Sequence, residues 1–334
     1  MTTPTPGQAP VTVAVVTWNS AEVLPGLIDS LAAGAEGVDY RLVVADNASS
    51  DETVDVVRRL APDATVVQTG RNAGYAAGVN AAVAAEPDAP AVLVLNPDVR
   101  LAPGCLSTLL AALERPDTGI AVPRLVDGDG ELICSMRRRP TLLRAFADAL
   151  IGAQRAGRWG TLGEVVTDPR QYDADARPEW AEGSTQLVSR ACLDAVGPWD
   201  ESFFLYSEET DFHLRAGERG LGVAYVARAS ATHLEGDSGA SPRLWALLTA
   251  NRLRLHARRS SFVGTTLYWL ALVLREATRA ARGDAIAQAA VRVLLRPGLL
   301  RAVRGPEWLD RVPVRSERAS WFADAPARRR ERTS

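Results

Sequence analysis

Short apolar runs alternate with helical patterns over the first hundred residues of the chain. The runs consist mainly of Val, Leu and Ala, a composition typical of strands that are buried on both faces. Helical patterns separate them, and Asn19 or Ser20 is expected to cap the first helix and Ser50 the second. The alternation predicts a doubly wound, mostly parallel α/β sheet, with strands at residues 11–17, 40–46, 64–68 and 91–95.

The run Ala91–Leu95 is expected to form the central strand of this sheet. It ends at Asn96, Pro97 and Asp98, where Pro97 cannot donate a ladder hydrogen bond. The Asp98 carboxylate is therefore expected at the carboxyl edge of the sheet, where open α/β sheets bind ligands. There it can coordinate a divalent cation that carries a diphosphate, or alternatively cap the following turn.

Polar residues also end two other strands, and a glycine-rich loop follows the third. Asn19 and Asp46 end the first two strands, so three polar strand ends are expected to meet in a nucleotide-type crevice. The loop 70–80 combines small residues with Arg71 and a helix N-terminus, which suits a phosphate group. Its glycine spacing differs from a Rossmann fingerprint, and a Walker loop is excluded because the chain has no lysine.

An acidic cluster opens a predicted helix in the second half of the chain. Glu208, Glu209 and Asp211 follow an aromatic loop, residues 199–206. A carboxylate in this position can take the proton of an acceptor hydroxyl, whereas the alternative is that these acids only stabilise the helix dipole. Between the two halves, strands are predicted at residues 120–123 and 131–136, and residues 137–179 receive no role.

Four motifs together resemble one enzyme family. They are Thr17-Trp18-Asn19, Asp46 to Asp51, Arg71 to Asn80, and Asn96-Pro97-Asp98. In order and spacing they are similar to the family-2 inverting glycosyltransferases of GT-A fold, especially the bacterial rhamnosyltransferase-like branch, over roughly residues 11–235. The resemblance implies a GT-A fold, a nucleotide-diphosphate sugar donor and a divalent cation, Mg²⁺ or Mn²⁺.

The resemblance also assigns roles to individual residues. The metal ligands would be Asp98 and His233, although a lone His is also often a packing residue. The general base would be Glu209, which departs from the family's usual Asp, with Glu208 and Asp211 as the neighbouring acids. The acceptor side would be formed by Trp180, Gly183, Ser184 and Trp199. The donor-binding residues would be Thr17, Asn19, Asp46, Asn47, Arg71, Asn72, Gly74, Asn80 and Asn96.

Charge is distributed unevenly between the two parts of the chain. Residues 1–240 carry a net charge of −14, whereas residues 241–334 carry +12 and contain apolar stretches at helical spacing. No apolar run reaches the roughly 18–20 residues that span a bilayer. The basic region is therefore expected to be a helical cap, or a platform on an anionic membrane surface. The expected division is a disordered lead-in at 1–10, a catalytic domain at 11–240, the basic helical region at 241–325 and a disordered basic tail at 326–334.

These features predict a cytoplasmic enzyme at the inner face of the cell membrane. Three widely spaced cysteines match no disulfide or zinc framework, and the N-terminus lacks an apolar signal core. The expected reaction transfers L-rhamnose from dTDP-L-rhamnose to a cell-envelope or exopolysaccharide acceptor, which can be polyprenyl-linked. The alternatives are a UDP-hexose donor, a sugar-phosphate nucleotidyltransferase, and a non-catalytic nucleic-acid-binding protein. The nucleic-acid alternative is disfavoured, because interleaved aromatic stacking residues are missing.

Overall fold

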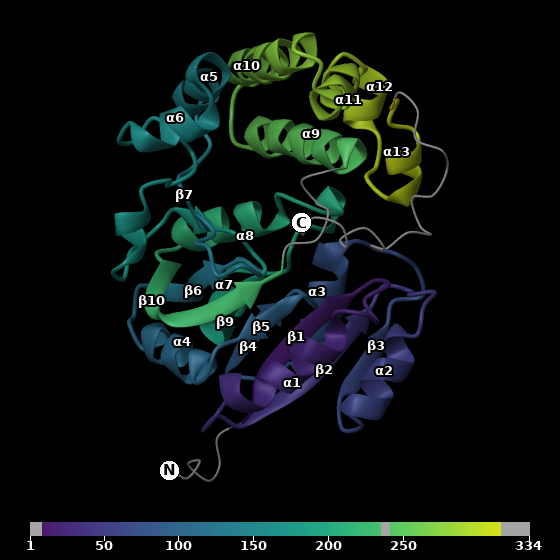
Figure 1. Ribbon diagram of the computed structural model, residues 1–334, viewed down its shortest axis with the longest axis vertical. Helices are drawn as coiled ribbons and strands as arrows, with labels where there is room; N and C mark the ends of the chain where they lie inside the picture. Colours follow the sequence, from purple (N-terminus) through teal and green to yellow (C-terminus); the bar gives the residue numbers. More distant parts are fainter. Residues whose placement is uncertain (1–8, 235–240, 315–334) are drawn as a thin grey trace, which may run out of the picture.

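An eight-stranded mixed sheet organises the protein (Figure 1). The computed structural model describes residues 9–234 and 241–314, so the predicted basic tail and most of the lead-in lie outside the described residues. The strand order is β3-β2-β1-β4-β9-β6-β10-β5, in which β9 and β5 run antiparallel to their neighbours. The strands are β1 Val11–Thr17, β2 Tyr40–Asp46, β3 Thr65–Gln68, β4 Ala91–Leu95, β5 Val99–Leu101, β6 Thr118–Val126, β9 Thr185–Ser189 and β10 Gly222–His233.

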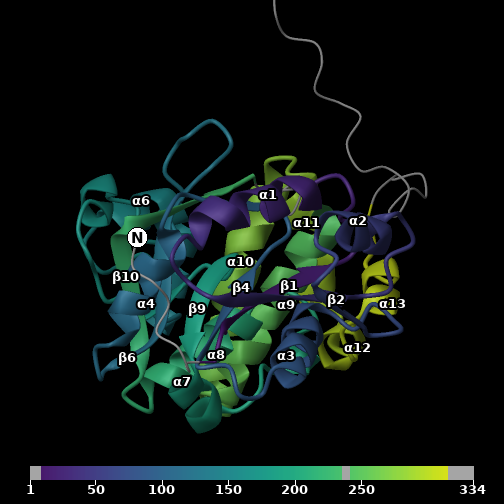
Figure 2. The same cartoon turned by 90° about the horizontal axis from the view of Figure 1, so that it is seen from below.

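Helices cover both faces of this sheet. Apolar side chains of α1, α2 and α4 form one core cluster with the sheet, and those of α3, α7 and α8 form another on the opposite face. Figure 2 shows α1 and α2 on the side of the sheet away from α3 and α7. The bounds are α1 Leu24–Gly34, α2 Thr53–Leu60, α3 Tyr75–Ala85, α4 Cys105–Leu113, α7 Arg190–Val196 and α8 Glu208–Gly217. The predicted α/β architecture with a central β4 is confirmed.

A second layer of helices lies over α8, on the side away from the sheet strands (Figure 1). The helices α5 and α6 come from the first half of the chain but belong to this layer. There α5 packs on α10 through an apolar cluster. No helix of the described residues is long and apolar enough to cross a membrane. The layer contains α5 Leu142–Ile151, α6 Ala153–Arg158, α9 Pro242–Arg258, α10 Phe262–Ala281, α11 Ala285–Leu294, α12 Pro297–Arg301 and α13 Pro306–Asp310.

Several local expectations require correction. The first helix begins at Leu24, and neither Asn19 nor Ser20 caps it. The Asn19 side chain accepts instead from Ser50, and the Ser20 hydroxyl donates to the Trp18 carbonyl. At the start of the second helix, the side chain of Asp51, not Ser50, accepts a hydrogen bond from the amide of Thr53. The strand expected at 131–136 is reduced to β7, Met136–Arg137, paired with β8, Trp180–Ala181.

Candidate active site

The ends of β1 and β2 are joined by a dense set of side-chain hydrogen bonds. The hydroxyl of Thr17 donates to Oδ1 of the buried Asp46 carboxylate at 3.0 Å. Ser49 donates to the same carboxylate from its amide and its hydroxyl. Asn19 Oδ1 accepts from the amide and hydroxyl of Ser50. Hydrogen bonds thus fix three sequence-predicted donor-binding residues, Thr17, Asn19 and Asp46, at the carboxyl edge of the sheet.

The glycine-rich loop is attached to this edge through Asn47. Asn47 Nδ2 donates to the carbonyl of Gly74 at 3.0 Å, and its Oδ1 accepts from Thr69 at the same distance. Asn72 Oδ1 accepts from the Gly74 amide, which closes a tight turn before α3. Gly74 has φ +94°, and a Cβ there would lie 2.3 Å from the carbonyl oxygen of Phe204, so this position requires glycine. Arg71 is exposed at the rim of the loop.

Asp98 and His233 lie side by side, although 135 positions separate them in the chain. The antiparallel pairing of β10 with β5 matches His233 with Val99, which brings the imidazole next to the preceding residue. Asp98 Oδ1 and His233 Nε2 are 3.4 Å apart, and both side chains are largely buried. The backbone carbonyl of Asp98 also accepts from the amide of Leu234, which secures this register.

This pair suits a divalent cation that is shared with a substrate. Two ligands at about 2.1 Å from one ion and at a right angle to each other lie about 3 Å apart, close to the observed separation. Within the residues that the structure describes, no group of three or more His, Cys, Asp or Glu side chains is arranged to hold a metal. An oxygen and a nitrogen donor from the protein would therefore leave coordination positions for diphosphate oxygens.

The end of β4 is connected to the acidic cluster through the start of β9. The amide of Asn96 donates to the Ser184 carbonyl at 2.9 Å. Next to Ser184, a Cβ added to Gly183 would lie 2.9 Å from Cβ of Glu209, so the Glu209 side chain packs directly on this glycine. Ser184 donates from its amide and its hydroxyl to the two carboxylate oxygens of Glu182. A continuous series of contacts thus joins Asn96, Ser184, Gly183 and Glu209.

Burial raises the pKa of both acids at the start of α8. Burial, followed by the charge of Glu209, raises the pKa of Glu208 well above its ordinary value, and Glu208 Oε2 is buried without a hydrogen-bond partner among the described residues. Burial and, to a lesser extent, the charge of Glu182 raise the pKa of the partly exposed Glu209 to about 7, while backbone N–H groups oppose the shift. A carboxylate with this pKa is well matched to proton abstraction near neutral pH. Burial of Glu208 shifts its equilibrium in the same direction, towards the protonated form.

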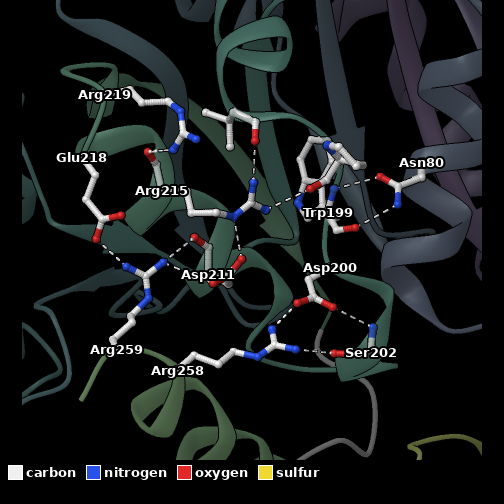
Figure 3. A network of polar contacts seen from close by, with 12 residues as sticks. Asn80, Trp199, Asp200, Ser202, Asp211, Arg215, Glu218, Arg219, Arg258 and Arg259 are labelled. Carbon is white, nitrogen blue, oxygen red and sulfur yellow. Dashed lines mark hydrogen bonds and ion pairs between the residues drawn. The ribbon is translucent and has the colours of Figure 1, made fainter. Parts of the chain in front are cut away.

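Asp211 has two arginine partners (Figure 3). Its Oδ2 accepts from Arg215 at 2.7 Å and its Oδ1 from Arg259 at 3.2 Å, and Arg259 also pairs with Glu218. Since both carboxylate oxygens are engaged, Asp211 ties the helix α8 to the end of α9. The sequence placed Asp211 among the catalytic acids, and the structure gives it a connecting position.

Asn80 and Trp199 lie elsewhere than the sequence suggested. Asn80 exchanges hydrogen bonds with the backbone of Trp199 (Figure 3). Its side-chain amide also donates to Glu201, so the amide is occupied. Trp199 is 2% exposed and stacks on Phe212 at 3.8 Å, so it is a core residue and not an exposed acceptor contact. Trp180 is buried in β8 but lines a small cavity beside Glu209.

Comparison with known proteins identifies the family. Residues 12–161 match the model of "Glycosyl transferase family 2". Over 238 residues, the chain is 31% identical to N-acetylglucosaminyl-diphospho-decaprenol L-rhamnosyltransferase of Mycobacterium tuberculosis, a match that covers 68% of this chain and 76% of that protein. The chain belongs to glycosyl transferase family 2.

Further relatives support this glycosyltransferase assignment. Rhamnosyltransferase WbbL of Escherichia coli is 23% identical over 231 residues, which cover 67% of this chain and 83% of WbbL. The mannosyltransferase PcManGT from Pyrobaculum calidifontis, solved in complex with GDP-Man and Mn²⁺, shares 18% identity with a TM-score of 0.52, over 86% of this chain and 82% of that one. The predicted GT-A fold and the rhamnosyltransferase-like branch are thereby confirmed.

The sequence reasoning missed two residues of this glycosyltransferase that interact electrostatically with the acidic cluster. The Tyr75 hydroxyl is buried and has no hydrogen-bond partner within the part of the chain that the structure describes. Burial raises its pKa well above the ordinary value, and the charges of Glu208, Glu182, Glu209 and Asp98 add to this shift. The second missed residue is Glu182, whose charge contributes to the raised pKa of Glu209. Both stand next to residues that the motifs had singled out, Gly74 and Gly183, and this adjacency was the available signal.

The loop before the two acids of this glycosyltransferase is strained. Phe204, Tyr206 and Ser207 all have positive φ values between 67° and 75°. Such conformations persist only where the surroundings impose them. Here Asn251 of α9 donates to three carbonyls of the segment, those of Phe203, Leu205 and Tyr206. The helical layer thus holds the backbone that carries Glu208 and Glu209.

Proposed function

We propose that this enzyme is an inverting glycosyltransferase that moves L-rhamnose from dTDP-L-rhamnose to a saccharide linked through diphosphate to a polyprenol. The support from the site is the continuous series of contacts that joins Asn96, Ser184, Gly183 and Glu209. These contacts connect Glu209, whose carboxylate has a pKa of about 7, to the end of β4, where Asp98 lies. The choice of L-rhamnose and of the acceptor class is supported by the name of the Mycobacterium tuberculosis relative, and the dTDP-linked donor is what the family resemblance implies.

In the proposed reaction, Glu209 accepts the proton of an acceptor hydroxyl. The hydroxyl oxygen forms a bond to the anomeric carbon while the bond from that carbon to the diphosphate oxygen breaks on the opposite face, so the configuration inverts. The nucleoside diphosphate leaves with the bonding electrons. The Asn47-anchored loop and the Thr17–Asp46 edge orient the nucleotide, and the raised pKa of Glu208 disfavours a second negative charge next to the base.

Asp98 and His233 are the proposed ligands of a divalent cation, Mg²⁺ or Mn²⁺. When bound, the cation would offset the negative charge that develops on the leaving diphosphate. The exposed Arg71 at the loop rim is proposed to supply further positive charge to the same group.

We further propose that residues 11–240 act as the catalytic domain and that residues 241–325 bring the enzyme to the cytoplasmic membrane surface. Support comes from the charge difference between these two parts of the chain. A lipid-linked acceptor is confined to a bilayer, so peripheral attachment would bring the crevice and the acceptor together. Nucleic acid is not a proposed partner.

The decisive experiment incubates purified protein and Mn²⁺ or Mg²⁺ with dTDP-L-rhamnose and a short-chain N-acetylglucosaminyl-diphospho-prenol. We expect mass spectrometry to detect one added deoxyhexose, and NMR to show inverted anomeric configuration. A matched reaction with UDP-glucose tests the alternative donor, and transfer only from the UDP-hexose would contradict the rhamnose assignment. Retained configuration would contradict the single-displacement mechanism.

A further inference from the structure

The helix α10 carries apolar side chains on the face that points away from the protein. Val263, Leu267, Leu270 and Leu274 are 65%, 39%, 43% and 39% exposed. Their spacing of four, three and four residues places them in one stripe along the helix. The opposite face of α10, which includes the buried Tyr268, packs into the helical layer. A surface helix usually presents polar residues here, so this stripe requires a partner.

The neighbouring helix α5 extends the same apolar surface. Leu143 and Leu150 are 65% and 71% exposed, and their separation of seven residues places them on one face of the helix. The two helices are in direct contact, because Ala145 of α5 belongs to the same buried cluster as Tyr268 and Ala271 of α10. In Figure 1, α5 and α10 lie at the end of the molecule opposite the β1–β3 part of the sheet.

An arginine-lined groove borders this surface. A cavity of about 670 Å³ lies among α5, α6, α9 and α10. Leu150 and Leu274 line it and are also exposed on the apolar surface, so the groove opens at the edge of the stripe. Four guanidinium groups reach its walls, those of Arg155, Arg275, Arg279 and Arg282.

The groove has an excess of accessible positive charge. Arg155 and Arg282 are exposed, and neither takes part in an ion pair among the described residues. Arg275 pairs with the buried Glu276, and Arg279 pairs with Glu276 and Asp284. Both guanidinium groups also lie over the Trp245 ring, at 5.4 and 4.8 Å from its centroid. The one acid of the described chain that lines the groove, Asp148, is buried, and burial raises its pKa, which favours the neutral form. An anionic group that enters the groove therefore meets the exposed guanidinium groups of Arg155 and Arg282.

We propose that this face, formed by the exposed leucines of α5 and α10 and the arginine-lined groove, docks on an anionic lipid bilayer. The leucines enter the boundary between headgroups and acyl chains, and the groove receives a lipid phosphate. A symmetric dimer through the same face would bring the arginines of both copies together, which disfavours that occupant. The inference rests on the proposed function for its purpose, since a lipid-linked acceptor lies in such a surface.

The test compares two substitutions that each add one negative charge at an equally exposed leucine. Leu270→Glu changes the docking face, where Leu270 is 43% exposed, and Leu60→Glu changes α2, where Leu60 is 40% exposed. Full-length protein is sedimented with vesicles of phosphatidylcholine that contain phosphatidylglycerol, and with phosphatidylcholine alone. We expect the wild type and Leu60→Glu to bind the anionic vesicles alike, and Leu270→Glu to bind at least about tenfold more weakly.

Charge substitutions separate the groove from the stripe. Arg155→Gln with Arg282→Gln should weaken binding and reduce its sensitivity to salt, whereas Arg59→Gln, an exposed arginine of α2, should change neither. Equal binding of Leu270→Glu and Leu60→Glu would overturn the proposal. So would a wild-type dimer that Leu270→Glu dissociates, measured by light scattering.

Activity in solution separates this proposal from the proposed function. With a short-chain, water-soluble acceptor, Leu270→Glu should transfer sugar at the wild-type rate, because Leu270 lies on the exposed face of α10 and does not line the cavity beside Glu209. Loss of vesicle binding with retained transfer supports the docking face. Absence of transfer by the wild type would contradict the proposed function and leave the vesicle result to be judged by itself.

Discussion

The side chain of Arg304 donates from Nε to Oδ1 of Asn251 at 3.2 Å, in the buried interior of the helical layer. This contact leaves the Asn251 amide hydrogens for the carbonyls of the strained loop before α8. Arg304 itself is secured by the carbonyls of Leu299, Leu300 and Ala302. The C-terminal helices are therefore part of the support of the proposed active site.

Asn251→Asp tests this support. The substitution keeps the oxygen that faces Arg304 but replaces two N–H donors by an acceptor opposite three carbonyls. We expect the free energy of unfolding to fall by about 1–3 kcal/mol, and kcat to fall while the donor KM changes little. The control is Thr249→Val on the same helix, since among the described residues the Thr249 hydroxyl bonds only to the Trp245 carbonyl within α9. A normal kcat for Asn251→Asp would show that the support of this loop by Asn251 does not affect catalysis.

Asp98→Asn tests the proposed metal pair. The amide is close in shape to the carboxylate, so folding should be retained, but most turnover and metal-dependent nucleotide binding should be lost. His233→Gln should raise the Mn²⁺ concentration required for half-maximal activity. Asp127→Asn, in a surface turn, is the matched control. Wild-type transfer by Asp98→Asn at limiting metal would exclude Asp98 as a ligand. Isothermal titration of nucleotide with and without Mn²⁺ provides a readout besides activity.

Glu209→Gln tests the general base. It preserves the volume of the side chain and removes its basicity, which is worth about 10²–10⁴ in rate, while donor binding should barely change. Glu208→Gln should be milder, because burial raises the pKa of Glu208 and so favours a neutral side chain there. Asp211→Asn should weaken the ion pairs with Arg215 and Arg259, so it should lower the free energy of unfolding more than it lowers kcat. If Glu208→Gln abolishes transfer and Glu209→Gln does not, the base is Glu208.

The raised pKa of Glu209 predicts two opposite effects of pH. Activity should rise with pH through about 7, because the base must lose its proton. Stability should change in the other direction, since the folded protein favours the protonated carboxyl. The free energy of unfolding of the wild type should fall, relative to Glu209→Gln, as pH rises from 4.5 towards 7, by about 1–3 kcal/mol in total. Paired denaturant titrations at several pH values measure this difference, and a constant difference would contradict the raised pKa.

Tyr75→Phe tests whether the buried hydroxyl serves a substrate. Removing a buried hydroxyl that lacks a partner among the described residues should leave stability unchanged or increase it. If the hydroxyl contacts donor or acceptor, kcat/KM should fall by about tenfold, the loss of one hydrogen bond to a bound ligand. Tyr40→Phe on β2 is the control. Equal kinetics for Tyr75→Phe and wild type would assign Tyr75 to packing alone.

The amino-acid sequence by itself determined the strands and the polar ends of this protein. Burial on both faces of a parallel strand requires a continuous apolar run, so β1, β2 and β4 can be recognised from a few neighbouring residues. Parallel strands end at one edge, so the order of residues alone assigns Asn19, Asp46 and Asp98 to that edge. Helix starts were less accurate, because Asn19 and Ser50 use their side chains across the strand ends.

Tertiary structure alone decided which side chains meet. The pairing of β10 with β5 brings His233 to Asp98, and the packing of α8 on the start of β9 brings Glu209 to Gly183. The same packing buries Trp199 and gives Asp211 its partner Arg259, 48 positions away. A local hydrophobic pattern predicts that a residue is buried, but it does not predict which distant residue packs against it. The pKa of Glu209, which depends on burial by distant segments and on Glu182, is therefore a property of the folded chain.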